Sequence, residues 1–301
     1  HTMYDDYVYY IAPKPFIPAA RSLSHQFFGR YIKNCDAITG PSLKCQEYVD
    51  ALGLSRHVHI IPNPVELDKF APGAVNPADV TAVREKLAIP EDCTCVLFVG
   101  RLGQEKSCDV LLDCWAQAVS PEDKLKLLIV GDGPARPGLI KQAEALGITD
   151  RVIFPGKVMH DDIPPYLALG SLYATASLSD TNSISMLEGM ASGLPVLQLY
   201  DPLNGDQVTE GQNGFVFRNA MEMKQKLSAY QAMSPAEKQR LSESTRQSVA
   251  KKGYETLAEN LLTVYAEAAE HKRQTQDRPP LVLKIRRGLK HAVGKIYKPP
   301  R

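Results

Sequence analysis

Short apolar runs alternate with helical patterns along most of the chain from residue 94 onwards. The first run, 95–100, is continuously apolar and ends at a glycine, as is typical of a strand buried on both faces of a sheet. Similar runs follow at 125–130, 152–154, 172–176, 196–199 and 215–217. Because strands that alternate with helices usually form parallel sheets, the sequence predicts an α/β fold with a doubly wound sheet.

The composition supports a folded chain and excludes several classes of protein. The 301 residues are 44% hydrophobic and 23% charged, which is enough to bury a substantial core and excludes intrinsic disorder. Lysines and arginines number 35 against 34 acidic residues, whereas a nucleic-acid-binding protein is normally more basic. No apolar run reaches about 20 residues, so we expect no membrane-spanning helix. The six cysteines are too sparse for a disulfide scaffold or a zinc site, and we expect reduced thiols.

The remaining patterns divide the chain into four parts. Before residue 94, short apolar runs around a helical pattern are typical of the end of another α/β domain. Several prolines between 62 and 72 indicate a domain junction, and apolar residues at helical spacing after 253 predict a final helix that packs across both domains. We therefore expect the end of one domain at 1–66, a second domain at 67–252, a returning helix at 253–275 and a tail at 276–301.

The tail has a distinct chemical character. From Arg278 onwards it carries eight basic residues and no acidic residue. On a helix, its apolar residues Ile285, Leu289, Val293 and Ile296 would share one face. A basic amphipathic helix favours an anionic membrane surface. A solvated cationic tail fits the same pattern.

The segment 177–195 places two carboxylates around a predicted helix start. Ser183 opens this helix, Asp180 precedes it and Glu188 lies in its second turn. A helix start binds anions through its free N–H groups and its dipole. Carboxylates bind hydroxyl groups through charge-assisted hydrogen bonds. The segment therefore suits a ligand with phosphates and hydroxyls, although two surface acids beside a capped helix would give the same pattern.

A second segment, directly after the first strand, supplies positive charge. Gly100 allows close approach of a ligand to the backbone, and Arg101 and Lys106 can bind phosphate oxygens. Strand ends of open α/β sheets face the ligand crevice, so these side chains should point there. The pattern of a Walker phosphate loop is missing from this segment. A structural ion pair is the alternative role for Arg101.

Five sequence blocks resemble, in order, those of the retaining nucleotide-sugar glycosyltransferases of family four, which have the GT-B fold. The blocks are VGRLGQEKS, IVGDGPARPGL, FPGKVMHDDIPPYLALGSL, SDTNSISMLEGMASGLPV and EGQNGFVF. The opening HTMYDDYVYYI further resembles the 1,2-diacylglycerol 3-alpha-glucosyltransferase branch. The resemblance implies two Rossmann-like, doubly wound domains, the first for the acceptor and the second for the donor. It also implies that the first domain is incomplete, with roughly a hundred residues expected before His1.

The same resemblance implies roles for individual residues. Arg101 and Lys106 match the pair that holds the donor diphosphate and stabilises its departing charge. Asp180 stands where a glutamate is usual and is expected to bind hexose hydroxyls, and His1 is similar to a histidine near the reacting sugar. These four residues are the catalytic candidates. The implied donor-binding residues are Gly100, Arg101, Lys106, Gly156, Lys157, Val158, Asp180, Ser183, Ile184, Ser185 and Glu188.

Within this donor set, the residues have different expected partners. The segment 156–158 matches the part that lines the nucleotide base, and Glu188 matches a ribose ligand. Ser183 stands where a glycine is usual, and its backbone N–H is expected to serve the phosphate. A departing diphosphate needs positive charge, which these groups would supply without a metal or another cofactor.

The implied reaction moves a hexose, with glucose expected, from UDP-glucose or a similar donor to diacylglycerol with retention of configuration. Front-face substitution is the expected mechanism. The implied partners are a nucleotide sugar, a lipid acceptor and an anionic membrane surface, and the implied location is the inner face of the cell membrane. Aromatic and basic residues between 9 and 33 support a lipid acceptor. A polysaccharide or soluble acceptor, and a non-catalytic sugar-nucleotide-binding remnant, are the alternatives.

Overall fold

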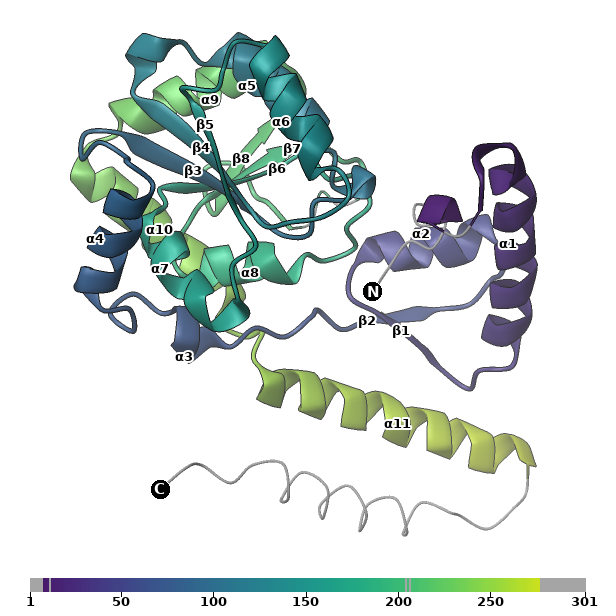
Figure 1. Cartoon of the computed structure of the whole chain (residues 1–301). Coiled ribbons are helices and arrows are strands. Elements are labelled where there is room, and N and C mark those ends of the chain that lie inside the picture. Colours follow the sequence, from purple (N-terminus) through teal and green to yellow (C-terminus); the bar gives the residue numbers. More distant parts are fainter. Residues whose placement is uncertain (1–7, 11, 204, 206, 277–301) are drawn as a thin grey trace.

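The structure is a computed structural model that describes residues 8–10, 12–203, 205 and 207–276. Within these residues the chain forms two parallel β-sheets, one with two strands and one with six (Figure 1). We call the described residues of 8–60, which contain the first sheet, the small unit. Those of 61–253, which contain the second sheet, are the large unit.

The sheet of the large unit has the strand order β5-β4-β3-β6-β7-β8, and all its neighbouring strands are parallel. The chain moves outward from β3 to β5 and then returns to place β6 on the other side of β3. This reversal makes a switch point between β3 and β6, where open α/β sheets bind ligands. The strands are β3 (Thr94–Val99), β4 (Leu125–Val130), β5 (Val152–Gly156), β6 (Leu172–Thr175), β7 (Val196–Leu199) and β8 (Gly214–Phe217).

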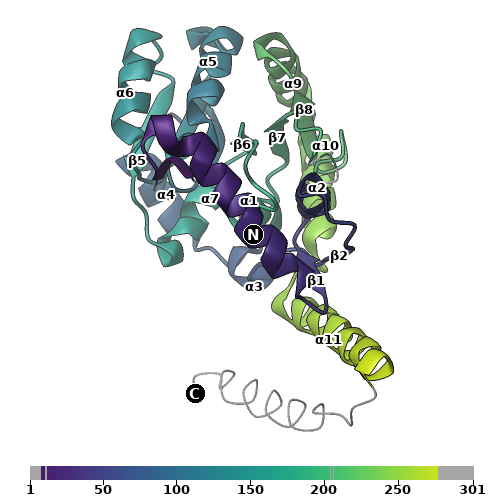
Figure 2. The ribbon, with the colours of Figure 1, turned by 90° about the vertical axis from the view of Figure 1, so that its right-hand side faces the viewer.

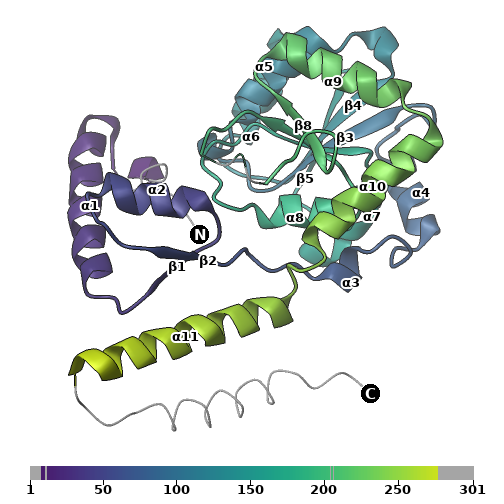
Figure 3. The same cartoon turned by 180° about the vertical axis from the view of Figure 1, so that it is seen from behind.

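Helices cover both faces of this sheet. On one face lie α5 (Cys108–Ala118), α6 (Arg136–Ala145) and α9 (Ala220–Ala232) (Figure 1). On the other lie α3 (Leu67–Phe70), α4 (Pro77–Lys86), α7 (Ile163–Leu169) and α8 (Ile184–Ala191). The helix α10 (Pro235–Val249) runs from the α9 side to the α8 side (Figure 3). Short 3-10 turns are η4 (Gln104–Lys106), η5 (Pro121–Asp123) and η6 (His160–Asp162).

Burial on both faces explains why the strands are continuously apolar. In β3, Val96 and Phe98 pack into the core beneath α5, whereas Leu97 and Val99 pack into the core beneath α7 and α8. Successive side chains of a strand point to opposite faces, so each position of β3 meets an apolar layer. The predicted doubly wound α/β sheet is therefore confirmed.

The small unit is a helix-flanked pair of strands. Its parallel strands are β1 (Ile38–Gly40) and β2 (Val58–Ile60), and its helices are α1 (Ile17–Lys33) and α2 (Leu43–Ala51), after the turns η2 (Val8–Tyr10) and η3 (Lys14–Phe16). A small core contains Ile32, Val49, Leu54 and Val58. The helix α1 forms the outer side of this unit (Figure 2).

The helix α11 (Tyr254–Gln276) follows the large unit and runs beneath the small one (Figures 1 and 3). Lys272 near its end pairs with Asp36 at 3.0 Å. His1 and the tail from 277 onwards lie outside the described residues. The division at 66, 252 and 275 stays a prediction. None of the described helices is both long and apolar enough to cross a membrane.

Candidate functional site

The loops that follow β3 and β4 are packed directly against each other. The Gly100 N–H donates to Val130 O at 3.0 Å, and the Leu102 N–H donates to Asp132 O at 2.9 Å. A Cβ on Gly131 would lie 1.9 Å from Gly100 O, and the φ of Gly131 is +141°. Only glycine fits this contact. The turn 131–133, which follows β4, therefore fixes the backbone from which Arg101 extends.

Arg101 is held by a buried carboxylate that the sequence analysis did not select. Its Nη2 lies 2.6 Å from Oε1 of Glu105, and the Glu105 side chain is fully buried. The Tyr9 hydroxyl donates to the other oxygen of Glu105 at 2.5 Å. The hydroxyls of Ser177 and Ser179 donate to the backbone carbonyl of the same residue. Glu105 thus links the loop after β3, the loop after β6 and the small unit.

Lys106 and Asp180 form the central ion pair of the site. Lys106 Nζ lies 2.5 Å from Asp180 Oδ1, and both side chains are less than one fifth exposed. These residues are 74 positions apart in the sequence. The structure therefore brings together two of the four catalytic candidates at the switch point between β3 and β6.

The start of α8 lies beside this pair. Ser183 caps the helix, because its Oγ accepts from the Met186 N–H at 3.4 Å. Ser185 Oγ lies 3.2 Å from Ser183 Oγ and 2.9 Å from the Tyr173 hydroxyl. A Cβ on Gly100 would lie 4.0 Å from Ser185 Oγ, so the loop after β3 and the helix start are neighbours. Ile184, at the first position of the helix, is half-exposed.

Glu188 lies further along α8, on the side that faces the loop after β5. It is only 6% exposed, and burial raises its pKa to about 7, although Lys69 lowers that pKa in part. The Nδ1 atom of His160, in η6, lies 3.7 Å from Glu188 Oε1. The loop containing His160 begins with the predicted base-binding segment 156–158. Glu188 therefore lies beside the turn that follows that segment.

The predicted base-binding segment 156–158 is hydrogen-bonded to the loop after β4, at the carboxyl edge of the sheet. The Gly131 N–H donates to Gly156 O at 2.9 Å, which links the loops after β4 and β5. Gly156 has a φ of +84°, Lys157 is exposed, and Val158 packs against the core beneath α8.

The predicted donor-binding residues thus lie at the carboxyl edge of β3, β5 and β6 and at the start of α8, except for Glu188, which lies in the second turn of that helix. The structure adds Glu105 and His160, which the sequence analysis missed. A carboxylate four residues after Arg101 was a visible signal for Glu105, whereas no local pattern pointed to His160. Among the described residues, no group of three or more His, Cys, Asp or Glu side chains is arranged to hold a metal ion.

Residues 79–248 match the family described as glycosyl transferases group 1. The chain belongs to this family. It is 29% identical over 217 residues to the alpha-monoglucosyldiacylglycerol synthase of Streptococcus pneumoniae, covering 72% of this chain and 49% of that protein. It is 27% identical over 226 residues to the enzyme of the same name from Acholeplasma laidlawii, covering 74% and 57%. The chain therefore spans about half the length of the curated relatives it matches.

Solved structures share the fold, among them the crystal structure of a glycosyltransferase from Rickettsia africae ESF-5, with a TM-score of 0.70 and 16% identity over 80% of this chain and 66% of that one. The crystal structure of Anabaena Alr3699/HepE in complex with UDP and glucose aligns with a TM-score of 0.71 and 19% identity, covering 85% of this chain and 68% of that one. The predicted GT-B fold, with two Rossmann-like parts of which the first has only two strands among the described residues, is confirmed.

Proposed function

We propose that this chain carries the donor site of a hexosyltransferase that moves glucose from UDP-glucose to diacylglycerol with retention of configuration. The observation that carries this proposal is the meeting of Lys106 and Asp180 beside the start of α8. A cation for phosphate, a carboxylate for sugar hydroxyls and a helix start for an anion share one edge of the sheet. The names of the two curated relatives support glucose and diacylglycerol.

In this proposal, the diphosphate binds between Arg101, Lys106 and the N–H groups at the start of α8. Lys106 is then shared between the phosphate and Asp180, while Asp180 accepts hydrogen bonds from the hexose. Positive charge is thereby placed where negative charge develops as the bond from the sugar to the diphosphate breaks. Glu105 keeps Arg101 in position, and Glu188 accepts from the ribose hydroxyls beside the base-binding segment 156–158.

Retention follows from the stereochemistry of donor and product. Glucose is α-linked in UDP-glucose, and the names of the relatives specify an alpha-glucoside. We propose front-face substitution, in which the leaving diphosphate oxygen and the acceptor hydroxyl lie on the same side of the sugar. Arg101 and Lys106 would then stabilise the charge on the leaving oxygen as it accepts the proton of the acceptor.

The helix α1 supports a lipid acceptor. Leu23, Phe27 and Tyr31 recur every four residues along α1, and these three and Phe16, just before the helix, are each more than 60% exposed. The helix has no acidic residue and contains Arg21, Arg30 and Lys33. Exposed aromatic residues with basic neighbours are typical of helices that lie on anionic membranes. We propose that this face rests on the inner surface of the cell membrane.

Nucleotide binding tests the donor site. Thermal unfolding of the chain is followed with UDP, GDP and ADP and with their glucose conjugates. We expect UDP and UDP-glucose to stabilise the chain, and both Arg101→Ala and Lys106→Ala to weaken this effect. Lys124→Ala is the matched control, because Lys124 lies at the opposite edge of the sheet and pairs with Asp92. Equal responses in Lys106→Ala and Lys124→Ala would contradict the proposal.

Turnover tests the acceptor and the stereochemistry. UDP-glucose is incubated with diacylglycerol in anionic vesicles and, separately, with water-soluble sugars. We expect an α-glucosyl lipid, identified by the NMR coupling constant of its anomeric proton, and vesicle binding that is lost in Phe27→Asp. A β-linked product would exclude retention, and transfer to soluble sugars alone would exclude the lipid acceptor.

A further inference from the structure

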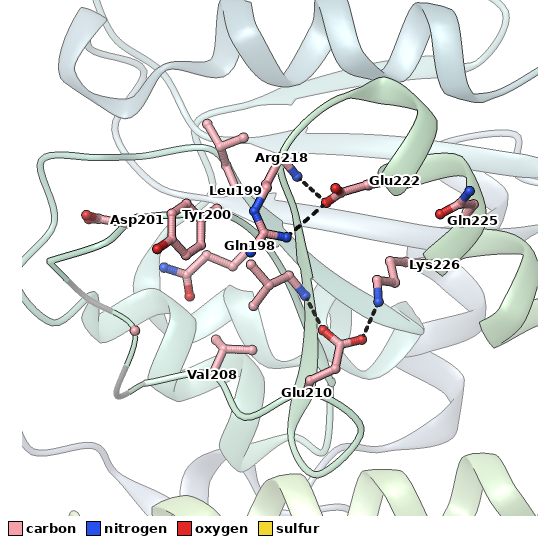
Figure 4. Close-up of a pocket in the computed structure, with 12 residues that line it drawn as sticks. Gln198, Leu199, Tyr200, Asp201, Val208, Glu210, Arg218, Glu222, Gln225 and Lys226 are labelled. Carbon is pink, nitrogen blue, oxygen red and sulfur yellow. Dashed lines mark hydrogen bonds and ion pairs between the residues drawn. The ribbon is translucent and has the colours of Figure 1, made fainter.

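A cavity of about 550 Å³ lies away from the candidate donor site, at the carboxyl ends of β7 and β8 and against α9 (Figure 4). Gln198, Tyr200, Glu210, Arg218 and Glu222 are among the residues that line it. None of its lining residues belongs to the predicted donor set. Its volume falls within the usual range of small-molecule sites.

One buried side chain in this cavity lacks a partner. Gln198, in β7, is only 5% exposed, and its Oε1 accepts no hydrogen bond from the residues that the structure describes. Nearly all buried polar groups in folded proteins are hydrogen-bonded, because an unpaired acceptor loses its water without compensation. A ligand in the cavity that donates to Gln198 Oε1 would supply the missing partner.

The charges around the cavity indicate a neutral ligand. Among the described residues that line it, each carboxylate already has a cation nearby. Glu210 pairs with Lys226 at 2.6 Å, Glu222 lies 3.5 Å from Arg218, and Asp201 pairs with Lys44 at 2.8 Å. With the charges balanced in this way, the cavity offers no net attraction for an ion.

The same groups suit the recognition of hydroxyls. The carboxylates of Glu210 and Glu222 keep lone pairs for further donors, and Gln198 needs a donor. The half-exposed ring of Tyr200 is backed by the Arg218 guanidinium at 4.6 Å, and such a ring can pack against the C–H face of a sugar. Many acceptors around one aromatic ring match a polyhydroxyl ligand better than an apolar one.

We infer that this cavity is a second site, for a neutral saccharide, in which Gln198 Oε1 accepts a hydrogen bond from a sugar hydroxyl. The loop after β7 connects it with the donor edge. Val208 lines the cavity, and its neighbour Gln207 donates to Thr181 O at 2.7 Å and accepts from Asn182 at 3.2 Å. A saccharide in the cavity would therefore contact the segment that supports the loop of Asp180.

Saturation-transfer NMR with maltose tests this site on the whole chain. We expect a maltose signal that persists with saturating UDP and in Arg101→Ala. We expect Gln198→Leu and Tyr200→Ala each to weaken binding about tenfold or more. Gln117→Leu is the matched control, because Gln117 is an exposed glutamine on α5 that bonds only locally to Asp113 O. Thermal unfolding of each variant verifies that it is folded, and Tyr200 is exposed enough to be replaced without loss of the core.

A second arm uses vesicles that contain a glucosyl lipid, which separates a free saccharide from a lipid headgroup as the source of the sugar. Binding of either probe that depends on Gln198 supports the site. Three results would overturn it: no binding of either probe, equal binding by wild type and Gln198→Leu, or displacement of maltose by UDP. The last result would assign the sugar to the donor site. Failure of UDP to bind would contradict the proposed donor site and leave this test unaffected.

Discussion

At the scale of single residues, Glu105 determines where the Arg101 guanidinium lies. Both carboxylate oxygens are engaged, one by Arg101 and the other by Tyr9. In Glu105→Gln, the ion pair becomes a weaker hydrogen bond from the guanidinium to a neutral amide oxygen, and the amide NH₂ can no longer accept from Tyr9, while the side chain keeps its shape. We expect UDP to bind about tenfold more weakly, a loss of ~1.4 kcal/mol, with less effect than Arg101→Ala. Titration calorimetry measures both, and an unchanged Kd in Glu105→Gln would show that Arg101 is positioned by other contacts.

Glu188 makes the stability of the fold depend on pH. Burial raises its pKa from 4.5 to about 7, so the folded state retains a proton that the unfolded chain releases. The charged form is therefore disfavoured in the fold. The contribution of Glu188 to the free energy of unfolding is fully present below about pH 4.5 and is lost as the pH rises through about 7.

Glu188→Gln removes this titration and leaves a neutral side chain of the same shape. Between pH 5 and 8, we expect wild type to lose up to ~3 kcal/mol of unfolding free energy relative to Glu188→Gln. Urea unfolding at several pH values measures the difference. Parallel pH profiles for the two proteins would mean that His160 and Lys69 hold the carboxylate ionised throughout this range.

At the scale of elements, the contact between the loops after β3 and β4 limits what residue 131 can be. In Gly131→Ala, the new Cβ would lie 1.9 Å from Gly100 O, at a φ that disfavours side chains. We expect a destabilisation of about 2–4 kcal/mol and a loss of UDP binding, because the backbone before Arg101 must move. Gly138→Ala in α6 is the control: nothing lies within 4 Å of its Cβ, and a helical alanine should stabilise slightly. Equal stability of the two variants would contradict the close contact.

The elements of the large unit were predictable because their sequence signal is local. Strand β3 is apolar at every position that meets a helical layer, and Ser183 caps a helix that ends before a glycine. The long-range pairs were not predictable from spacing. Lys106 and Asp180 were each selected from their own segments, but no spacing paired them, and no pattern linked Lys44 to Asp201 across 157 positions. The burial of Glu105 and Gln198 depends on segments that are distant in the sequence, so it is visible only in the folded chain.

At the scale of the whole molecule, a few polar contacts join the small unit to the loops of the large one. Lys44, at the start of α2, is 3% exposed; its Nζ donates to Asp201 at 2.8 Å and to the carbonyl of Leu178. Asn63, in the segment that follows the small unit, donates two hydrogen bonds to Asn182, one from its backbone N–H and one from its side-chain amide. These partners flank the loop that carries Asp180, so the position of the small unit and the shape of the donor edge depend on the same bonds.

Substitutions can test whether the Lys44–Asp201 ion pair holds the two units together. Lys44→Met leaves Asp201 buried without its cation, which typically costs about 3–5 kcal/mol, whereas Lys44→Met with Asp201→Leu removes both charges and should recover most of that loss. Hydrogen exchange should increase at 178–182 and 201–203 in the single variant. Lys272→Met, which removes an exposed pair with Asp36, is the control and should change stability by less than ~1 kcal/mol. If the single and double variants are equally unstable, the packing of Lys44 rather than its charge joins the units.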